Sequence, residues 1–198
     1  LYCDYFLAFN ELIGKKYLEI IDTKVLTVGS FKSNSDFKDR KNQKFDLLYI
    51  SSFNDEKKLI PNTEMTVKTY HKNQPHLLRQ IDIYAQKNGE NIFIYGKKED
   101  LREMVDEEKY FKNYLSNKST YIKNNRFKSL EIIDKSNIII TINSTLGYEA
   151  LTRGKKVIFF NILPNSKTSN FTKFGWPLDL DDEGLFWTKR FDDKSVFE

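Results

Sequence analysis

A run of small polar residues near position 144 has the composition of an anion-binding turn. Asn143, Ser144 and Thr145 follow five mostly β-branched apolar residues, 138–142, and a helical pattern comes after them. The apolar run is typical of a buried strand, and Ser or Thr is favoured where a helix begins. A helix amino terminus offers unpaired N–H groups and partial positive charge, which suit a phosphate. The run therefore predicts a phosphate-binding turn, with Glu149 about one turn inside the helix.

The elements around this turn must place it at the carboxyl ends of the strands of a parallel sheet. A second apolar run, 156–160, follows the helix, so that strand, helix and strand span about 24 residues as a βαβ unit. Ligands of such sheets lie at the carboxyl ends of the strands. Because nearly every residue of 137–142 is apolar or β-branched, we expect it to be an interior strand.

The rest of the chain repeats this alternation of strand and helix. We expect further strands at 45–50, 91–96 and 120–123, and helices at 71–88, 99–117 and 130–134. Gly89 stands where a glycine commonly ends a helix. The fold class that follows is α/β, with about five strands in a Rossmann-like parallel sheet over 45–160 and helices on both of its faces.

The segment 142–160, INSTLGYEALTRGKKVIFF, resembles the signature of bacterial surface-carbohydrate biosynthesis proteins. These glycosyltransferases of the GT-B class, with two Rossmann-like domains, make capsule, O-antigen and lipopolysaccharide. Residues 25–31 are similar to the hinge between the domains, and 174–177 and 184–188 to the carboxyl-terminal region. The resemblance implies that this chain holds the carboxyl-terminal half of a GT-B fold, which binds the nucleotide-sugar donor.

The resemblance also implies site residues. In the family a small-residue loop and a following Glu contact the phosphates, ribose or sugar of the donor, and the matching residues here are Asn143, Ser144, Thr145, Gly147 and Glu149. Ser51 and Ser52 follow a predicted strand and are candidates either to line the same cleft or to form a plain turn. Gly96 and Lys123 are further candidates to line it. We name no catalytic base, because most GT-B enzymes supply it from the upstream domain.

The first residues predict a strand at 4–9, a helix at 10–21 with Asn10 as its cap, and a strand at 24–28. This order closes the amino-terminal domain of a GT-B enzyme. We therefore expect three parts, which are 1–31 as the end of an upstream Rossmann-like domain with its hinge, 32–44 as a surface linker, and 45–198 as the donor-binding domain. On this interpretation the chain is a fragment that is inactive without its upstream domain. The alternative is a complete small domain that opens with its own βαβ unit.

Composition limits the partners and cofactors. The balance of 32 basic and 28 acidic residues, net +4, is too weak to indicate nucleic acid. It is compatible with an anionic donor and with peripheral contact with an anionic membrane. The single Cys3 excludes an intramolecular disulfide, and with two histidines, His71 and His76, it gives no metal-ligand spacing. No run approaches the roughly 18 apolar residues of a membrane span. We expect no metal or cofactor, and a location in the cytoplasm or at the inner face of the membrane.

Several motifs are absent, and their absence narrows the function. No P-loop, dinucleotide-binding G-x-G-x-x-G or G-x-S-x-G elbow is present, so nucleotide hydrolysis, NAD binding and serine hydrolysis have no support. We interpret four clustered acidic residues of the helix 99–117 as a solvated face rather than as catalytic carboxylates: Glu103, Asp106, Glu107 and Glu108.

The function that the resemblance implies is sugar transfer from a nucleotide to a saccharide or lipid-linked acceptor. Three alternatives stay open, which are a non-catalytic nucleotide- or partner-binding module, a nucleotide-sugar epimerase and a glycerophosphate transferase. The tail is rich in large aromatic residues, and we expect part of it to pack on a domain and exposed rings to promote self-association: Phe171, Phe174, Trp176, Phe186, Trp187, Phe191 and Phe197.

Overall fold

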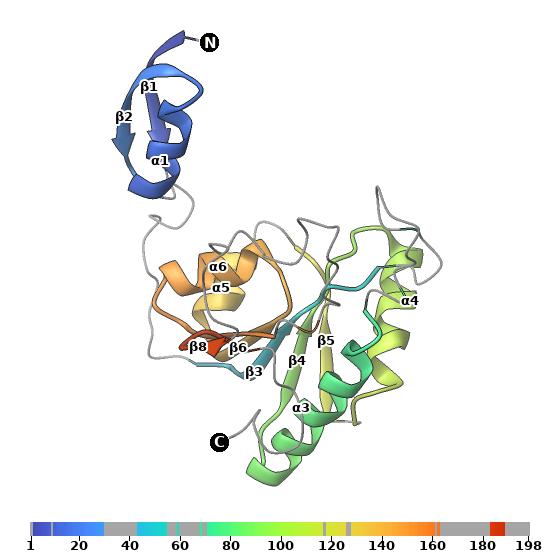
Figure 1. The fold of residues 1–198 in the computed structure, drawn as a ribbon. Helices are drawn as coiled ribbons and strands as arrows, with labels where there is room; N and C mark the ends of the chain where they lie inside the picture. Colours follow the sequence, from blue (N-terminus) through green and yellow to red (C-terminus); the bar gives the residue numbers. More distant parts are fainter. Residues whose placement is uncertain are drawn as a thin grey trace. The chain divides into compact units, whose positions relative to one another are not determined.

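A computed structural model describes most of the chain (Figure 1). The described residues are 2–8, 10–29, 43–54, 59, 68, 71–116, 118–125, 128–160, 162 and 183–188. The chain divides into two compact units, 1–38 and 39–198. Most of the expected linker, 32–44, lies outside the described residues, and the proposed division into hinge, linker and donor domain stays a prediction.

The first unit is a βαβ unit. The strands β1 (Tyr2–Ala8) and β2 (Asp22–Thr27) pair in parallel, and α1 (Glu11–Leu18) connects them. Asn10 caps the helix as expected, because its side chain accepts a hydrogen bond from the Ile13 N–H at 2.9 Å. Gly14 is explained by packing, since a Cβ there would come within 2.5 Å of Val25 Cγ1.

The described part of the second unit contains a single seven-stranded sheet. Its strands run in the order β5-β4-β3-β6-β7-β9-β8, and those from β5 to β9 pair in parallel while β8 pairs antiparallel with β9. The bounds are β3 Phe45–Ile50, β4 Ile92–Tyr95, β5 Ser119–Ile122, β6 Ser136–Thr141, β7 Lys156–Phe160, β8 Glu183–Gly184 and β9 Trp187–Thr188. The predicted parallel sheet is confirmed.

The strand β6 lies in the interior of this sheet, as predicted. It pairs in parallel with β3 on one side and with β7 on the other. Its Ile139 and Ile140 are buried, one in each of the two hydrophobic clusters of the unit. A strand that is apolar on both faces needs a cover on both faces, and this is why consecutive isoleucines suit it.

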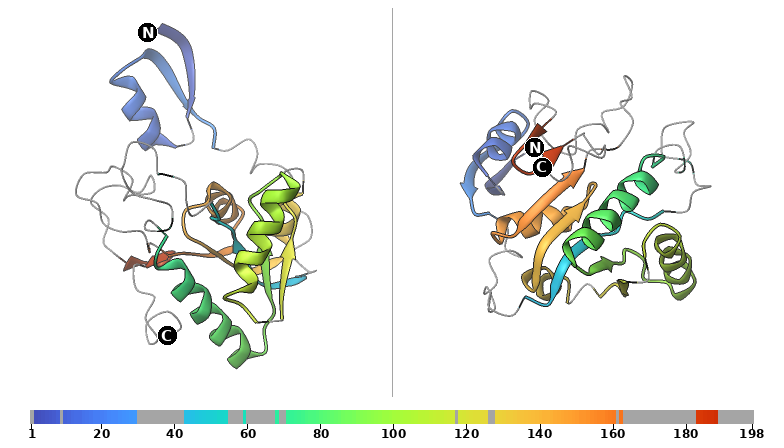
Figure 2. Two further views of the ribbon diagram at one scale, coloured as in Figure 1. Left: turned by 90° about the vertical axis from the view of Figure 1, so that its right-hand side faces the viewer. Right: turned by 90° about the horizontal axis from the view of Figure 1, so that it is seen from below.

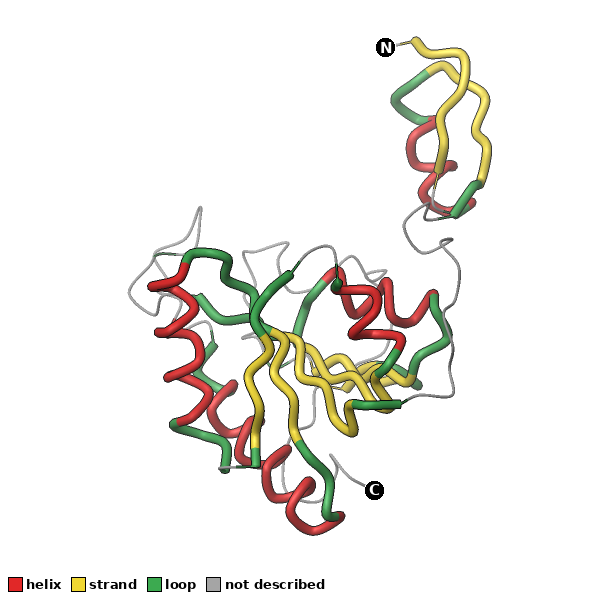
Figure 3. Tube along the Cα trace, turned by 180° about the vertical axis from the view of Figure 1, so that it is seen from behind, coloured by secondary structure: helices red, strands yellow, loops and turns green. Residues whose placement is uncertain are grey.

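Helices supply that cover on both sides (Figures 2 and 3). Leu77, Leu78 and Ile81 of α3 and Phe111 of α4 pack on one face of the sheet. Residues of α5 and α6, with Ile133 and Ala150 fully buried, pack on the other. The bounds are α3 Gln74–Asn88, α4 Leu101–Lys112, α5 Ser129–Asp134 and α6 Thr145–Thr152. The Rossmann-like fold class is therefore confirmed.

The order of the parallel strands from β3 to β7 contains one reversal. From β3 the chain passes outward through α3 to β4 and through α4 to β5, and then returns through α5 to β6, which pairs with β3 on its other side. From β6 it continues outward through α6 to β7. The strands β3 to β7 thus follow the first five places of the 3-2-1-4-5-6 order of doubly wound folds, whose ligands bind at the carboxyl ends of the strands where the order reverses. Here that point lies between β3 and β6.

The end of the sheet includes part of the aromatic tail. Trp187 lies in β9 and packs against the cluster around α5 and α6, while Phe186 is exposed. A Cβ at Gly184 would come within 2.3 Å of the Trp187 ring, so this short hairpin needs a glycine there. The remaining tail aromatics lie outside the described residues: Phe171, Phe174, Trp176, Phe191 and Phe197.

Candidate functional site

The turn between β6 and α6 lies beside the reversal point and contains the predicted phosphate-binding residues. Ser144 is the N-cap of α6, and its hydroxyl accepts a hydrogen bond from the Leu146 N–H at 3.2 Å. The Gly147 N–H donates to the Ser144 carbonyl at 3.0 Å. Asn143 and Thr145, on either side of the cap, are exposed. The turn thus uses Ser144 to begin the helix and presents its two neighbours to solvent.

Gly147 has a packing role. It is buried, and a Cβ at this position would come within 2.7 Å of Thr141 Cγ2 and 3.0 Å of the Phe159 ring. The absence of a side chain therefore lets α6 lie close to β6 and β7. This contact accounts for the glycine without a ligand, and its proposed contact with a donor stays a prediction.

Glu149 lies one turn inside α6 and is half-buried. Its carbonyl accepts hydrogen bonds from the Thr152 hydroxyl at 2.8 Å and the Arg153 N–H at 3.2 Å. The pKa of Arg153 is raised, chiefly by its hydrogen bond to Asp134, and the Glu149 carboxylate adds to this effect. The carboxylate therefore lies near a cation of its own helix, and donor binding by Glu149 stays a prediction.

The four candidates to line the cleft from other strands differ in exposure. Lys123, after β5, is exposed, whereas Ser51 and Ser52, after β3, are buried. Gly96, after β4, is also buried, and a Cβ there would come within 2.1 Å of the Tyr121 hydroxyl. The structure therefore places Ser51 and Gly96 against interior polar groups.

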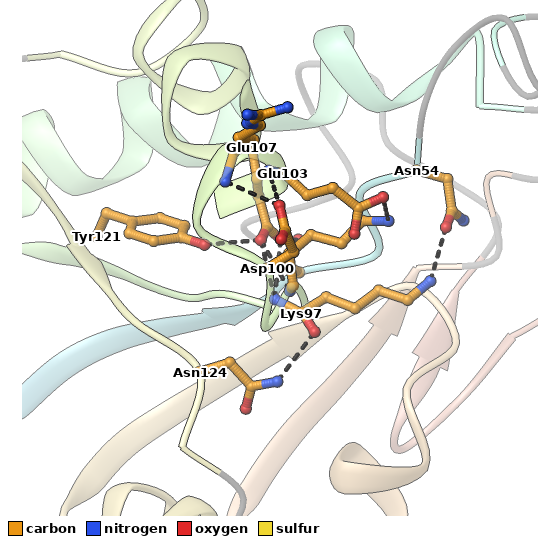
Figure 4. Close-up of polar contacts among 10 residues, drawn as sticks. Asn54, Lys97, Asp100, Glu103, Glu107, Tyr121 and Asn124 are labelled. Carbon is orange, nitrogen blue, oxygen red and sulfur yellow. Dashed lines mark hydrogen bonds and ion pairs between the residues drawn. The ribbon is translucent and has the colours of Figure 1, made fainter. Parts of the chain in front are cut away.

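Those groups surround Glu107 of α4 (Figure 4). Its carboxylate is 0% exposed and accepts a hydrogen bond from the Ser51 hydroxyl. The Tyr121 hydroxyl donates at 2.7 Å, and the backbone N–H groups of Lys97 and Lys98 donate at 2.9 and 3.0 Å. Because these donors come from β5 and from the segments after β3 and β4, Glu107 connects three neighbouring strand ends.

The interpretation of the acidic cluster as a solvated face was wrong for Glu107. The sequence contains a signal for its burial, because Glu107 stands three residues after Met104 and four before Phe111, both on the predicted inner face of the helix. Asp106 is exposed, and Glu103 forms an ion pair with Lys98 at 3.3 Å. The buried carboxylate is a polar feature that periodicity alone did not predict.

His71 lies just before α3 and is 8% exposed. Its pKa is lowered to about 4, first by burial and then by the positive charge of Lys97. The imidazole is therefore neutral in the folded protein at neutral pH, with one ring nitrogen that can donate a hydrogen bond and one that can accept.

We expect the free energy of unfolding to fall by roughly 2–3 kcal/mol as the pH is lowered from 6.5 to about 4. The unfolded chain protonates His71 near the ordinary pKa of 6.5, whereas the folded chain does so only near 4. Between these values the unfolded state binds more protons, so acid favours it. Urea denaturation at a series of pH values measures the loss. His71→Gln should reduce it and His76→Gln, at an exposed position, should not; equal pH dependence in both variants would contradict the assignment.

Two further observations concern ions and membranes. Within the described parts of the chain, no three His, Cys, Asp or Glu side chains gather as a metal ion would require. The expectation that no metal is used stays a prediction. None of the described helices is both long and apolar enough to cross a membrane.

Comparison with known proteins gives one family. No curated protein matches the chain. A protein family described as "putative O-antigen biosynthesis protein" matches residues 1–198.

Proposed function

Because the chain belongs to this family of O-antigen biosynthesis proteins, we propose that it binds the nucleotide-sugar donor of a glycosyltransferase. The donor site is the turn between β6 and α6. The glycosyltransferase makes bacterial surface polysaccharide, and its acceptor is a saccharide or a lipid-linked saccharide.

The observation that supports this proposal is the position of the turn in the sheet. The turn follows β6, which pairs with β3 where the strand order reverses. Doubly wound sheets bind nucleotides in the crevice at this point. The family supplies the carbohydrate chemistry, and the reversal point supplies a location for the nucleotide.

The turn has the groups that a diphosphate needs. Sugar transfer leaves negative charge on the departing phosphate, and a helix amino terminus stabilises that charge without a metal. The Ser144 hydroxyl is already bonded within the helix. We therefore assign direct contacts to the exposed Asn143 and Thr145 side chains, and contacts with ribose or sugar hydroxyls to Glu149, whose carboxylate can accept hydrogen bonds.

We expect Thr145→Glu to weaken nucleoside diphosphate binding by about 10-fold or more, which corresponds to about 1.4 kcal/mol. The substitution places negative charge where the phosphates bind. It should not unfold the helix, because an acidic residue in the first turn is favourable. Calorimetric titration of the wild type and the variant with uridine and cytidine diphosphates measures the effect.

The matched control is Thr152→Glu, which adds the same charge at the exposed opposite end of α6. It should leave the affinity unchanged. Glu149→Gln should keep the fold and reduce discrimination between diphosphates with and without a sugar. Equal affinities of the wild type and of all three variants would contradict the proposed site.

A further inference from the structure

A cavity of about 170 Å³ lies between the segment after β3, the beginning of α3 and α4. Its apolar walls are the rings of Phe53, Tyr110 and Tyr114 and the edge of Pro75. The three aromatic rings pack against the hydrophobic cluster of α3 and α4. The cavity is therefore on the face of the sheet opposite to α6, whose residues belong to the other cluster.

The planes of neighbouring rings are inclined to one another. Phe53 and Tyr110 have centroids 5.3 Å apart and planes inclined at 51°, and Tyr110 and Tyr114 have centroids 5.1 Å apart and planes inclined at 65°. A planar nucleobase stacks best on parallel ring faces. A puckered sugar ring, whose apolar C–H groups point in several directions, suits walls inclined in this way.

The charge at the cavity is positive. Lys68 and Lys72 line it, and its described lining residues include no Asp or Glu. Arg79 lies against an outer ring, with its Cζ 5.6 Å from the Tyr114 centroid, while Lys98, whose Nζ is 6.0 Å from the Phe53 centroid, is paired with Glu103. Clustered lysines favour a phosphate or carboxylate.

Polar groups that can bind hydroxyls complete the lining. Asn54 is held in place by a hydrogen bond from Lys97 Nζ to its Oδ1 at 3.0 Å, which leaves its amide N–H₂ able to donate. Gln74 is buried and donates from its Nε2 to the Tyr49 hydroxyl at 3.2 Å, so its orientation is fixed. Fixed amides of this kind give a small-ligand site its specificity.

The volume limits the ligand to one ring. A cavity of about 150 Å³ holds a benzene molecule, whereas sites for larger ligands have roughly 300–1,000 Å³. The cavity therefore encloses about one ring of a ligand, and the charged group lies at its rim beside the exposed Lys68 and Lys72.

We propose that this cavity is a second ligand site, which binds an anionic sugar: one pyranose ring that carries a phosphate or a carboxylate. The sugar ring packs on Tyr110 and Tyr114, and its charged group lies at Lys68 and Lys72. The site is separate from the turn before α6 and does not depend on the donor site proposed there.

Calorimetric titration with glucose 1-phosphate, glucuronate, glucose and inorganic phosphate tests the site. We expect at least one of the two anionic sugars to bind more tightly than glucose and than phosphate, because only they use both the rings and the lysines. The tighter of the two identifies phosphate or carboxylate as the preferred group. If neither exceeds both glucose and phosphate, the proposal is overturned.

Variants locate the binding. Lys72→Glu should weaken binding of the preferred sugar by on the order of 10-fold, and Lys87→Glu, which is exposed at the far end of α3, should not. Tyr114→Leu should also weaken it, with the unfolding midpoint as a check on the fold. Unchanged affinity in Lys72→Glu would overturn the assignment.

Two further measurements separate this site from the donor site. Thr145→Glu should leave anionic-sugar binding unchanged, and a loss in that variant would place the sugar at α6 and overturn the second site. Uridine monophosphate should bind independently of Lys72. If Lys72→Glu weakens it as much as it weakens the sugar, the cavity holds a nucleotide and the proposal is wrong.

Discussion

Replacing Glu107 by Ala should lower the free energy of unfolding by about 3–5 kcal/mol. The substitution leaves the Ser51 and Tyr121 hydroxyls and the N–H groups of Lys97 and Lys98 without their acceptor at a fully buried position. Domains of this size have about 5–15 kcal/mol of stability in total. The variant should therefore unfold at a much lower urea concentration than the wild type.

Two other substitutions make this test specific. Glu107→Gln keeps the shape but places an N–H₂ group against the backbone N–H of Lys97 or Lys98, which cannot accept a hydrogen bond, and it should cost about 2–3 kcal/mol. Asp106→Ala removes an exposed carboxylate from the same helix and should change stability by no more than about 0.5 kcal/mol. If Glu107→Gln is as stable as the wild type, the backbone N–H groups do not need both carboxyl oxygens of Glu107 as acceptors.

The Glu107 network also bears on the candidate sites. The carboxylate fixes Ser51, which directly follows β3, and the backbone of Lys97 and Lys98, which follow β4. Lys97 in turn donates to Asn54 of the cavity. A ligand site at strand ends must be rigid to keep its geometry, and a buried acceptor that binds several loops provides this. Sequence reasoning gave the strands but not this support.

Local signals predicted the elements well. β3 and β7 have the bounds that alternation of apolar runs suggested, 45–50 and 156–160. Asn10 caps α1, and Gly89 ends α3 with a φ of 70°. Capping and helix termination depend on neighbours within a few residues, so a single sequence contains the information.

Contacts between residues that are distant in the sequence were harder to predict from it. The alternation of strands and helices does not predict the order of the strands in the sheet. That β6 pairs with β3, after the chain returns from β5, depends on how the helices pack on both faces. The hairpin of β8 and β9 has only two residues in each strand, which is too short for a periodic pattern. In the turn before α6, the sequence allowed Ser144 to be a cap, a ligand contact or both. Its hydroxyl accepts a hydrogen bond from the Leu146 N–H, and its contact with a ligand stays a prediction.

Replacing Arg153 by Ala should cost about 3–5 kcal/mol, because it leaves Asp134 with a nearly buried, unpaired charge. Arg153 is 2% exposed and follows α6, and Asp134 is the last residue of α5. The guanidinium donates from Nε to Asp134 Oδ1 at 2.7 Å and from a terminal nitrogen to Oδ2. This two-bond geometry joins the carboxyl-terminal ends of the two helices on one face of the sheet.

Arg153→Lys separates charge from geometry. Lysine keeps the positive charge but cannot form both parallel bonds. We therefore expect a free energy of unfolding between that of the wild type and that of the Ala variant. The control is Lys135→Ala, which breaks an exposed pair with Glu131 and should cost less than about 1 kcal/mol. Urea denaturation measures all three. A Lys variant as stable as the wild type would show that charge alone holds α5 and α6 together, and an Ala variant no weaker than Lys135→Ala would show that the helices are held by their apolar contacts.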